Sequence, residues 1–167
     1  MTATASKIKA PYGTWESPLK AKDIASGALR LGQTITASGR IYWLEGRPKE
    51  AGRSTVVCKD RDGSVQEITE APFNVRSLVH EYGGGAYLPW GELLFFTNYK
   101  DQRIYVTGKN LAPKPVTVEL PCRYAAMTGD ERRKRIYCVV EDHSESGTEA
   151  RNYIAAINIE DVENDEF

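Results

Sequence analysis

The sequence predicts an all-β protein, and more narrowly a partial β-propeller of about three blades of antiparallel strands with one short amino-terminal helix. Aromatic and β-branched residues occur in short runs separated by Gly, Pro, Asn and Asp, which is typical of strands joined by turns. Three segments also repeat one pattern, a polar turn followed by a strand rich in Tyr, Trp, Phe and Leu: "SGRIYWLEG", "WGELLFFTN" and "RRKRIYCVVED". Their spacing, roughly 40 to 50 residues, is that of propeller blades.

The helix is expected within residues 1–27, which we interpret as an amino-terminal arm. In "SPLKAKDIASGA", Ser17 is a suitable cap, Pro18 suits the first helical position and Gly27 is a suitable stop. We therefore expect two or three helical turns over Pro18–Ala25.

Each repeat is expected to form the second strand of a blade. Blade 1, residues 28–70, would contain "RLGQTITA", the first repeat, "STVVCKD" and "SVQEIT", the last two joined by a two-residue turn at Asp62 and Gly63. Blade 2, residues 71–120, would contain "GGGAYLP", the second repeat, "QRIYVTG" and "PVTVEL".

Blade 3, residues 121–160, is expected to be incomplete. It offers "CRYAAMT", the third repeat and "RNYIAAINI", whereas residues 161–167 form an acidic tail that is poor in strand formers. Propellers close with roughly four to eight blades, so three cannot close. We expect either the amino-terminal part of a longer protein or an open stack, in which an unpaired blade edge would favour self-association.

Composition excludes several partners. The net charge is -1, with 27% charged residues, so there is no basic excess for nucleic acid or an anionic membrane. No apolar run of about eighteen residues and no signal-like segment is present, which favours a cytoplasmic protein. The cysteines, Cys58, Cys122 and Cys138, are an odd number without a Cys-x-x-Cys pair. We expect buried, reduced thiols, and no metal or other cofactor.

Five segments and the spacing between them together resemble one protein family: "PYGTWESPL", "IYWLEGRPKEAGRS", "APFNVRSLVHEYGGGAY", "FTNYKDQRIY" and "CRYAAMTGDERRKRIYCVVEDH". From Tyr12 to Ile159 the chain resembles the amino-terminal propeller of the prolyl oligopeptidase family of serine peptidases. The likeness is strongest to the bacterial branch described as dipeptidyl aminopeptidase or acylaminoacyl-peptidase-like. The resemblance implies a propeller of about seven blades over an α/β-hydrolase domain that cleaves short peptides.

The family's nucleophile lies in a Gly-x-Ser-x-Gly elbow, and these 167 residues contain none. The resemblance therefore assigns no catalytic residue to the chain, which we predict to be inactive alone. Its expected partners are the hydrolase domain or the remaining blades. The function it implies is restriction of access, so that only short peptides reach the active site. The alternative is a stand-alone, non-catalytic β-sheet binding module, or a truncated reading frame, that pairs with another chain.

The run "HEYGGG" invites a catalytic interpretation, but it has no neighbouring nucleophile for an oxyanion hole, and no helix with a Lys-Ser or Lys-Thr pair for a phosphate loop. Gly83, Gly84 and Gly85 are better explained by a sharp turn into the innermost strand, where space is limited. His80, Glu81 and Tyr82 would then lie at a propeller face or tunnel rim and are candidates for gating substrate, as is Arg76.

The loop "WLEGRPKEAGRS" supplies two further gating candidates, Arg47 and Arg53. Their guanidinium groups could bind a substrate carboxylate, but a network with Glu45 and Glu50 that fixes the loop is the favoured interpretation.

Two other sets of residues receive structural roles. Trp43, Phe95 and Tyr137 occupy matching positions of the repeats and are expected to pack between neighbouring blades. The run Glu141 to His143 looks like a metal cluster, but adjacent strand residues point to opposite faces, so a strand-end turn is the better interpretation.

Overall fold

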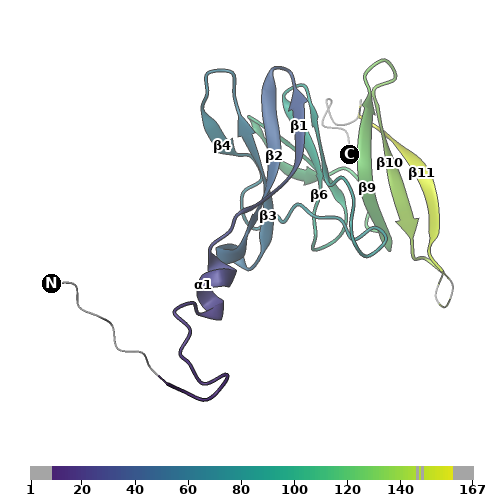
Figure 1. The fold of residues 1–167 in the computed structure, drawn as a ribbon. Helices are drawn as coiled ribbons and strands as arrows, with labels where there is room; N and C mark the ends of the chain where they lie inside the picture. Colours follow the sequence, from purple (N-terminus) through teal and green to yellow (C-terminus); the bar gives the residue numbers. More distant parts are fainter. Residues whose placement is uncertain (1–8, 146, 148, 160–167) are drawn as a thin grey trace.

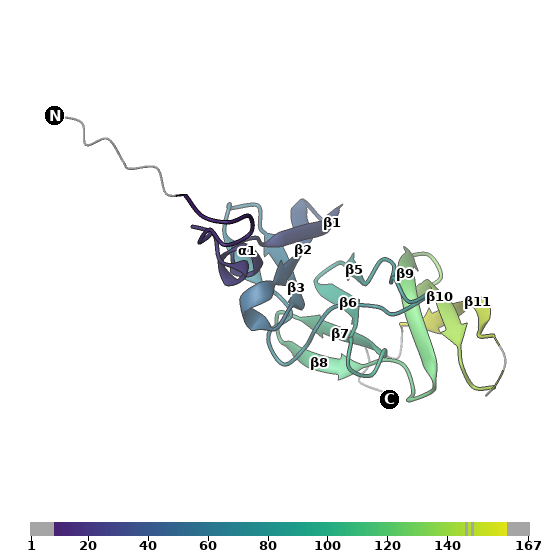
Figure 2. The ribbon, with the colours of Figure 1, turned by 60° about the horizontal axis from the view of Figure 1, so that its bottom comes forward.

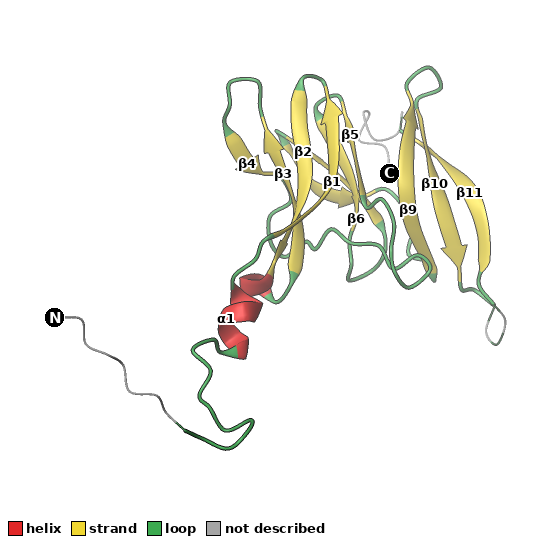
Figure 3. Ribbon diagram, in the orientation of Figure 1, coloured by secondary structure: helices red, strands yellow, loops and turns green. Residues whose placement is uncertain are grey.

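The computed structural model describes residues 9–145, 147 and 149–159, and these are nearly all β-strand and connecting loop (Figure 3). They form three antiparallel sheets and one short α-helix, α1 (Ala21–Ser26), which confirms the predicted fold class. The proposed acidic tail, 161–167, lies outside the described residues. Among the residues described, no helix has the length and apolar character that a membrane span requires.

The three sheets follow one another along the chain and stand side by side (Figures 1 and 2). The first contains β1 (Arg30–Ala37), β2 (Arg40–Arg47), β3 (Arg53–Lys59) and β4 (Val65–Glu67), with a 3-10 turn, η1 (Pro48–Glu50), between β2 and β3. The second contains β5 (Tyr87–Trp90), β6 (Leu93–Thr97), β7 (Ile104–Gly108) and β8 (Leu111–Pro115). The third contains β9 (Cys122–Asp130), β10 (Arg135–Asp142) and β11 (Arg151–Asn158). Each sheet keeps its strands in sequence order, as expected of propeller blades.

The helix begins later than predicted. Pro18 is not helical, because Ser17 Oγ instead accepts a hydrogen bond from the Leu19 amide (3.1 Å) in a local turn. Lys20 is extended and is the N-cap, and its amide donates to Asp23 Oδ2 (3.2 Å). The predicted stop at Gly27 agrees with the structure.

The prediction for the fourth strand of blade 2 was also wrong. It is β8, "LAPKP", which follows β7 after a two-residue connection, and not "PVTVEL". The two prolines of β8 are tolerated because β8 is the edge strand of its sheet. The chain stays attached to β7 as far as Thr117. The Val116 amide donates to Ile104 O (2.8 Å), and Thr117 Oγ1 accepts from the Ile104 amide (3.1 Å), before the chain crosses to blade 3.

The turn between β3 and β4 differs in type from the prediction. The amide of Gly63 donates to Asp60 O (3.0 Å), and Asp60 itself pairs with Ser64 (2.9 Å). Gly63 has φ +87°, whereas Asp62 does not have positive φ. The connection is thus a three-residue loop with glycine in the left-handed position rather than a two-residue turn.

Two buried clusters hold the blades together. One lies between blades 1 and 2 and the other between blades 2 and 3. Phe96 belongs to the first and Phe95 to the second, because neighbouring residues of β6 point to opposite faces. Both side chains are fully buried. The three cysteines are free and buried, as predicted.

Trp43 and Tyr137 do not belong to either cluster, and their predicted packing role is wrong. Both are half-buried, and Trp43 Nε1 donates instead to Glu45 Oε1 (3.0 Å). The preceding residues, Tyr42 and Ile136, occupy the cluster positions. The repeat was therefore aligned one residue out of phase with the pleat, which exchanges the two faces of a strand.

The first strands of the blades, β1, β5 and β9, are neighbours in space. Bulges in β1 and β9 bring Gln33 (φ +41°) and Ala126 (φ +52°) against the start of β5. Gln33 Oε1 accepts from the Ala86 amide (2.8 Å), and the Ala126 amide donates to Gly85 O (2.7 Å). These bonds fix the backbone that leads into β5.

Candidate functional site

The segment that leads from blade 1 into blade 2 runs as a strap between the two sheets. The Val75 amide donates to Ser54 O in β3 (2.8 Å), and the Arg76 amide donates to Thr97 O in β6 (3.1 Å). This strap carries "NVRSLVHEYGGG" past the loop "WLEGRPKEAGRS". Two motifs that are separate in the sequence are thereby brought together.

Both motifs line one open cavity of about 590 Å³. Its wall is completed by α1 and the start of β1. The lining residues are Ile24, Ala28, Arg30, Leu44, Gly46, Pro48, Gly52, Ser54, Val75, Arg76, Ser77, Tyr82, Gly83, Gly84 and Ala86. We refer to it as the strap cavity. Its size is that of a site for a small ligand or a short peptide.

The glycines of "HEYGGG" are required by close backbone approaches. Gly83 has φ +83°, and a Cβ there would lie 2.8 Å from Ser77 O. A Cβ at Gly84 would lie 3.0 Å from Ala125 Cβ, in blade 3. The run therefore lets the chain turn tightly against its neighbours, as the sequence predicted, and leaves the cavity open.

Two of the predicted gating residues, Arg76 and Tyr82, line the strap cavity. Tyr82 is 91% exposed, and the Arg76 side chain lies over the ring of Tyr99, with 5.0 Å between the guanidinium carbon and the ring centroid. Stacking of this kind holds the plane of a guanidinium group while leaving its N–H edge available to a ligand.

Arg47 and Arg53 lie beside the cavity but do not line it. Arg53 binds Glu50 (2.7 Å) and Glu67 (2.6 Å), and Arg47 contacts Glu45 (3.3 Å), Glu50 (3.2 Å) and Glu67. Arg53 also donates to two backbone carbonyls, those of Thr69 (2.9 Å) and Phe73 (3.2 Å). The guanidinium donors are thus occupied within the protein, which supports the Arg–Glu network rather than substrate binding. Glu67, from β4, is the member that the sequence did not reveal.

We expect this network to make stability depend on acidic pH. Burial tends to raise the pKa of Glu67, but hydrogen bonds from Arg53, Arg47 and Thr55 outweigh it, so the pKa lies below its usual value. A lowered carboxyl pKa contributes stability that is present above the unfolded pKa, about 4.3, and is lost as the pH falls through the folded value. The free energy of unfolding should therefore decline below about pH 4.

Urea denaturation across the acidic range measures this decline, and Glu67→Gln should make it shallower. Glu70→Gln is the control, because Glu70 is exposed and has no ion pair among the described residues. An equal decline in Glu67→Gln and in the unmodified protein would contradict the prediction.

His80 and Glu81 are held by blade 3 rather than directed into the strap cavity. The His80 amide donates to Glu141 Oε2 (2.8 Å), and Glu81 pairs with Arg123 (2.6 Å). Hydrogen bonding from Arg123 lowers the pKa of Glu81. His80 and Glu81 have φ +53° and +65°, an unusual pair of left-handed residues that these contacts maintain.

Arg123 and Glu141 are the residues at this rim that sequence reasoning missed. Glu141 is nearly buried, lies 3.4 Å from His143 Nε2 and 3.6 Å from Arg123, and joins the strap to β10. Asp142 instead accepts from the Ser144 amide (2.9 Å), consistent with the predicted strand-end turn. The alternation of strand residues predicted that Glu141 and Asp142 point in opposite directions. It did not predict that Glu141 would bond to His80 of the strap.

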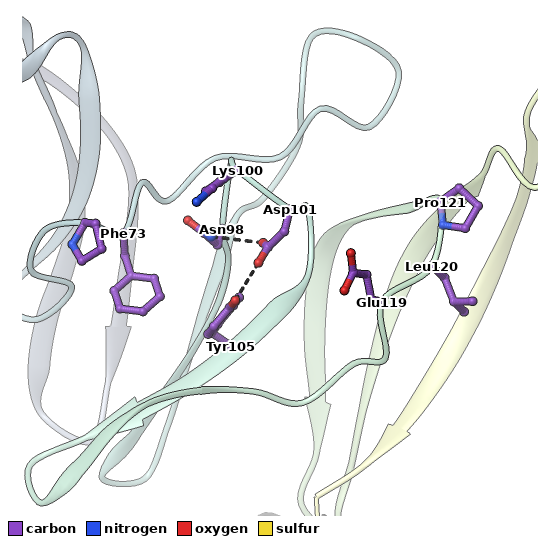
Figure 4. Close-up of a pocket in the computed structure, with 9 residues that line it drawn as sticks. Phe73, Asn98, Lys100, Asp101, Tyr105, Glu119, Leu120 and Pro121 are labelled. Carbon is purple, nitrogen blue, oxygen red and sulfur yellow. Dashed lines mark hydrogen bonds between the residues drawn. The ribbon is translucent and has the colours of Figure 1, made fainter.

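A second hollow, of about 760 Å³, lies between the strap and the connection from blade 2 to blade 3 (Figure 4). Asp101 at its centre accepts hydrogen bonds from Tyr105 Oη (2.6 Å) and Asn98 Nδ2 (3.1 Å). Burial, and then the bond to Asp101, raises the pKa of Tyr105 to about 12. None of the predicted gating residues lines this hollow, so the strap cavity remains the candidate site.

The solved structures that are similar to this chain include three of peptidases or hydrolases. A puromycin-hydrolyzing peptidase of Mycobacterium tuberculosis shares 35% sequence identity over 92% of this chain and 25% of that chain, with a TM-score of 0.79. Two crystal structures of puromycin hydrolase, one of them a mutant complexed with PGG, share 32% identity over 90% of this chain, with TM-scores of 0.78 and 0.77. No model of a protein family and no curated protein sequence matches the chain.

The three stacked antiparallel sheets and these similar structures define the chain as part of a β-propeller. It corresponds to the propeller part of peptidases of the prolyl oligopeptidase family, and the family predicted from the sequence is confirmed. The chain spans 25% of the length of each of these peptidases. A shared fold over that part does not by itself carry over the activity of the whole enzyme.

Proposed function

We propose that this chain is a propeller part that restricts the access of short peptides to an α/β-hydrolase domain, in a peptidase of the dipeptidyl aminopeptidase or acylaminoacyl-peptidase-like branch. The observation that carries the proposal is the strap cavity. The two most distinctive motifs of the sequence line it together, in a chain that is 35% identical to part of a puromycin-hydrolyzing peptidase. Puromycin-like aminoacyl compounds and short peptides are the substrate class we infer.

The mechanism would be steric and positional. Packed blades exclude folded proteins by size, while the open cavity at the strap accepts the end of a short chain. Arg76 and Tyr82 would contact that end, and the Arg–Glu network would keep the adjoining loop in place. His80 and Glu81, fixed by Glu141 and Arg123, would shape the rim on the side of blade 3.

A chimera tests the proposal. This chain would replace the matching quarter of the Mycobacterium tuberculosis peptidase. We expect the chimera to hydrolyse short aminoacyl and peptidyl substrates and to spare folded proteins. Tyr82→Ala together with Arg76→Gln should raise KM for the short substrates, while Tyr153→Ala, on β11, serves as the matched control. Cleavage of folded proteins by the chimera at the rate of short peptides would refute gating.

The 167 residues alone are expected to hydrolyse no chromogenic aminoacyl or acylaminoacyl substrate. They contain no Gly-x-Ser-x-Gly elbow, and each member of a catalytic triad needs the others in place. Release of chromophore by the purified chain is the measurement, with the chimera as positive control. Turnover that survives purification and is abolished by a serine-directed inhibitor would overturn the expectation.

A second candidate function, as a module that pairs with another chain through a sheet edge, is favoured by β11. Among the described residues β11 pairs only with β10, and Tyr153 and Ile154 are exposed large side chains on it. We expect concentration-dependent self-association in sedimentation experiments, reduced by Ile154→Lys because a charge on an edge strand opposes strand addition. A monomer at every concentration would count against this function.

A further inference from the structure

Two arginines of the strap cavity, Arg30 and Arg76, have no anionic partner in the part of the chain that the structure describes. Neither forms an ion pair with any described residue, and no Asp or Glu is among the residues that line the cavity. This differs from Arg47 and Arg53 next to it, which are saturated by three glutamates. The cavity therefore presents guanidinium groups whose charge is not neutralised locally.

The surroundings of the two arginines differ: the β1–β2 pairing positions the stem of Arg30, and a ring contact positions the guanidinium group of Arg76. Arg30 begins β1 opposite Gly46 of β2, and a Cβ at Gly46 would lie 3.3 Å from Arg30 Cβ, so the glycine leaves room for the arginine stem. Arg76 is held over the ring of Tyr99. A carboxylate accepts paired N–H bonds from arginine, so two arginines that line one cavity suit a ligand of this kind.

The remaining lining is largely apolar or small. Leu44 and Pro48 supply apolar surface, and Ile24 of α1, 69% exposed, lies at the edge, whereas Val75 and Ala86 behind them are almost fully buried. An apolar wall beside a cationic group suits an apolar residue that carries a carboxylate. The carboxy-terminal end of a peptide has both features.

We propose that the strap cavity binds the free carboxyl terminus of a short peptide with an apolar last residue, through Arg30 and Arg76. The proposal deepens the gating function and rests on it for biological meaning, but the binding is a property of the chain alone. The sequence suggested Arg47 and Arg53 as carboxylate-binding candidates. The proposal assigns this role to Arg30 and Arg76 instead.

The test compares acetyl-Ala-Phe with acetyl-Ala-Phe-amide, which differ only in the terminal charge. Binding to the 167-residue chain is measured by titration calorimetry. We expect the free acid to bind at least about tenfold more tightly than the amide, since hydrogen bonds to charged groups are the stronger class. Added salt should reduce this preference.

Arg30→Gln and Arg76→Gln should each weaken binding of the free acid about tenfold and leave binding of the amide unchanged. Arg135→Gln is the matched control, because Arg135 also begins a strand, is exposed and has no ion pair among the described residues. All three positions are on the surface, and circular dichroism verifies that the fold is retained. Equal affinities for acid and amide, no binding of either peptide, or an equal loss in Arg135→Gln would each overturn the proposal.

The peptide titration and the chimera assay test different claims and can give different results. A chain that prefers the acid, combined with a chimera that does not exclude folded proteins, would support the carboxylate site and refute gating. A gating chimera combined with a chain that does not distinguish the two peptides would refute only the carboxylate site.

Discussion

Phe96→Ala is expected to reduce the free energy of unfolding by about 3 to 5 kcal/mol, the range for removing a large aromatic side chain from a core. Phe96 is fully buried in the cluster between blades 1 and 2. Its ring meets Phe73 edge to face, with centroids 5.5 Å apart, and stacks on Tyr105 at 5.7 Å. The substitution removes both contacts and leaves a cavity at the blade interface.

A loss of this size is a large share of the free energy of unfolding of an ordinary domain. The fraction of unfolded molecules at room temperature should therefore rise. Denaturant titration followed by circular dichroism gives the change. Tyr153→Ala is the control, since Tyr153 is 46% exposed and should alter stability by about 0.5 kcal/mol or less. A loss below about 1 kcal/mol for Phe96→Ala would show that the blades do not depend on this cluster.

Arg53→Met is expected to be nearly as damaging, at about 3 kcal/mol or more. The Arg53 side chain is 11% exposed and donates to Glu50, Glu67 and the carbonyls of Thr69 and Phe73. Methionine fills similar volume but removes the Arg53 donor from Glu67 and from both carbonyls. Among the described residues Glu67 then keeps only Arg47 and Thr55 as partners, and Phe73 O loses its donor. The cost arises from buried acceptors that lose their partner rather than from the lost attraction alone.

Two further variants show which interactions cause the loss of stability in Arg53→Met. Arg61→Met is the matched control, because Arg61 is exposed and its side chain bonds only to Ser38 O among the described residues, so a change within about 0.5 kcal/mol is expected. Glu67→Gln added to Arg53→Met should restore part of the stability, since it removes a carboxylate charge that has lost one of its two arginine partners. If Arg53→Met and Arg61→Met cost the same, the network is not what fixes this loop.

Strand positions were largely predictable from local sequence. Turn residues, and a strand pattern repeated at blade spacing, placed all but one of the strands close to their observed ranges. The exception is β8, which contains two prolines. The β-forming residues that follow it favoured "PVTVEL" as the strand instead. Propensity does not report that an edge position tolerates proline.

The orientation of side chains was less predictable. Tyr42 and Trp43 are both large aromatics, and nothing local says which one faces the neighbouring blade. The bulges at Gln33 and Ala126 are equally invisible in the sequence, because they are stabilised by hydrogen bonds to β5 of the adjacent blade. A one-residue change of phase exchanges the faces of a strand, so small errors of alignment become complete errors of orientation.

By itself, the sequence determined the all-β class, the three-blade order, the family and the importance of the two motifs. These depend on short-range patterns of polarity and turn residues. Only the tertiary structure decided that the motifs share one cavity, that Glu67 and Glu141 neutralise the arginines beside it, and that Arg30 and Arg76 within it form no ion pair with a described residue. Ion pairs form between groups that the fold brings within a few ångströms, and sequence distance carries no information about that proximity.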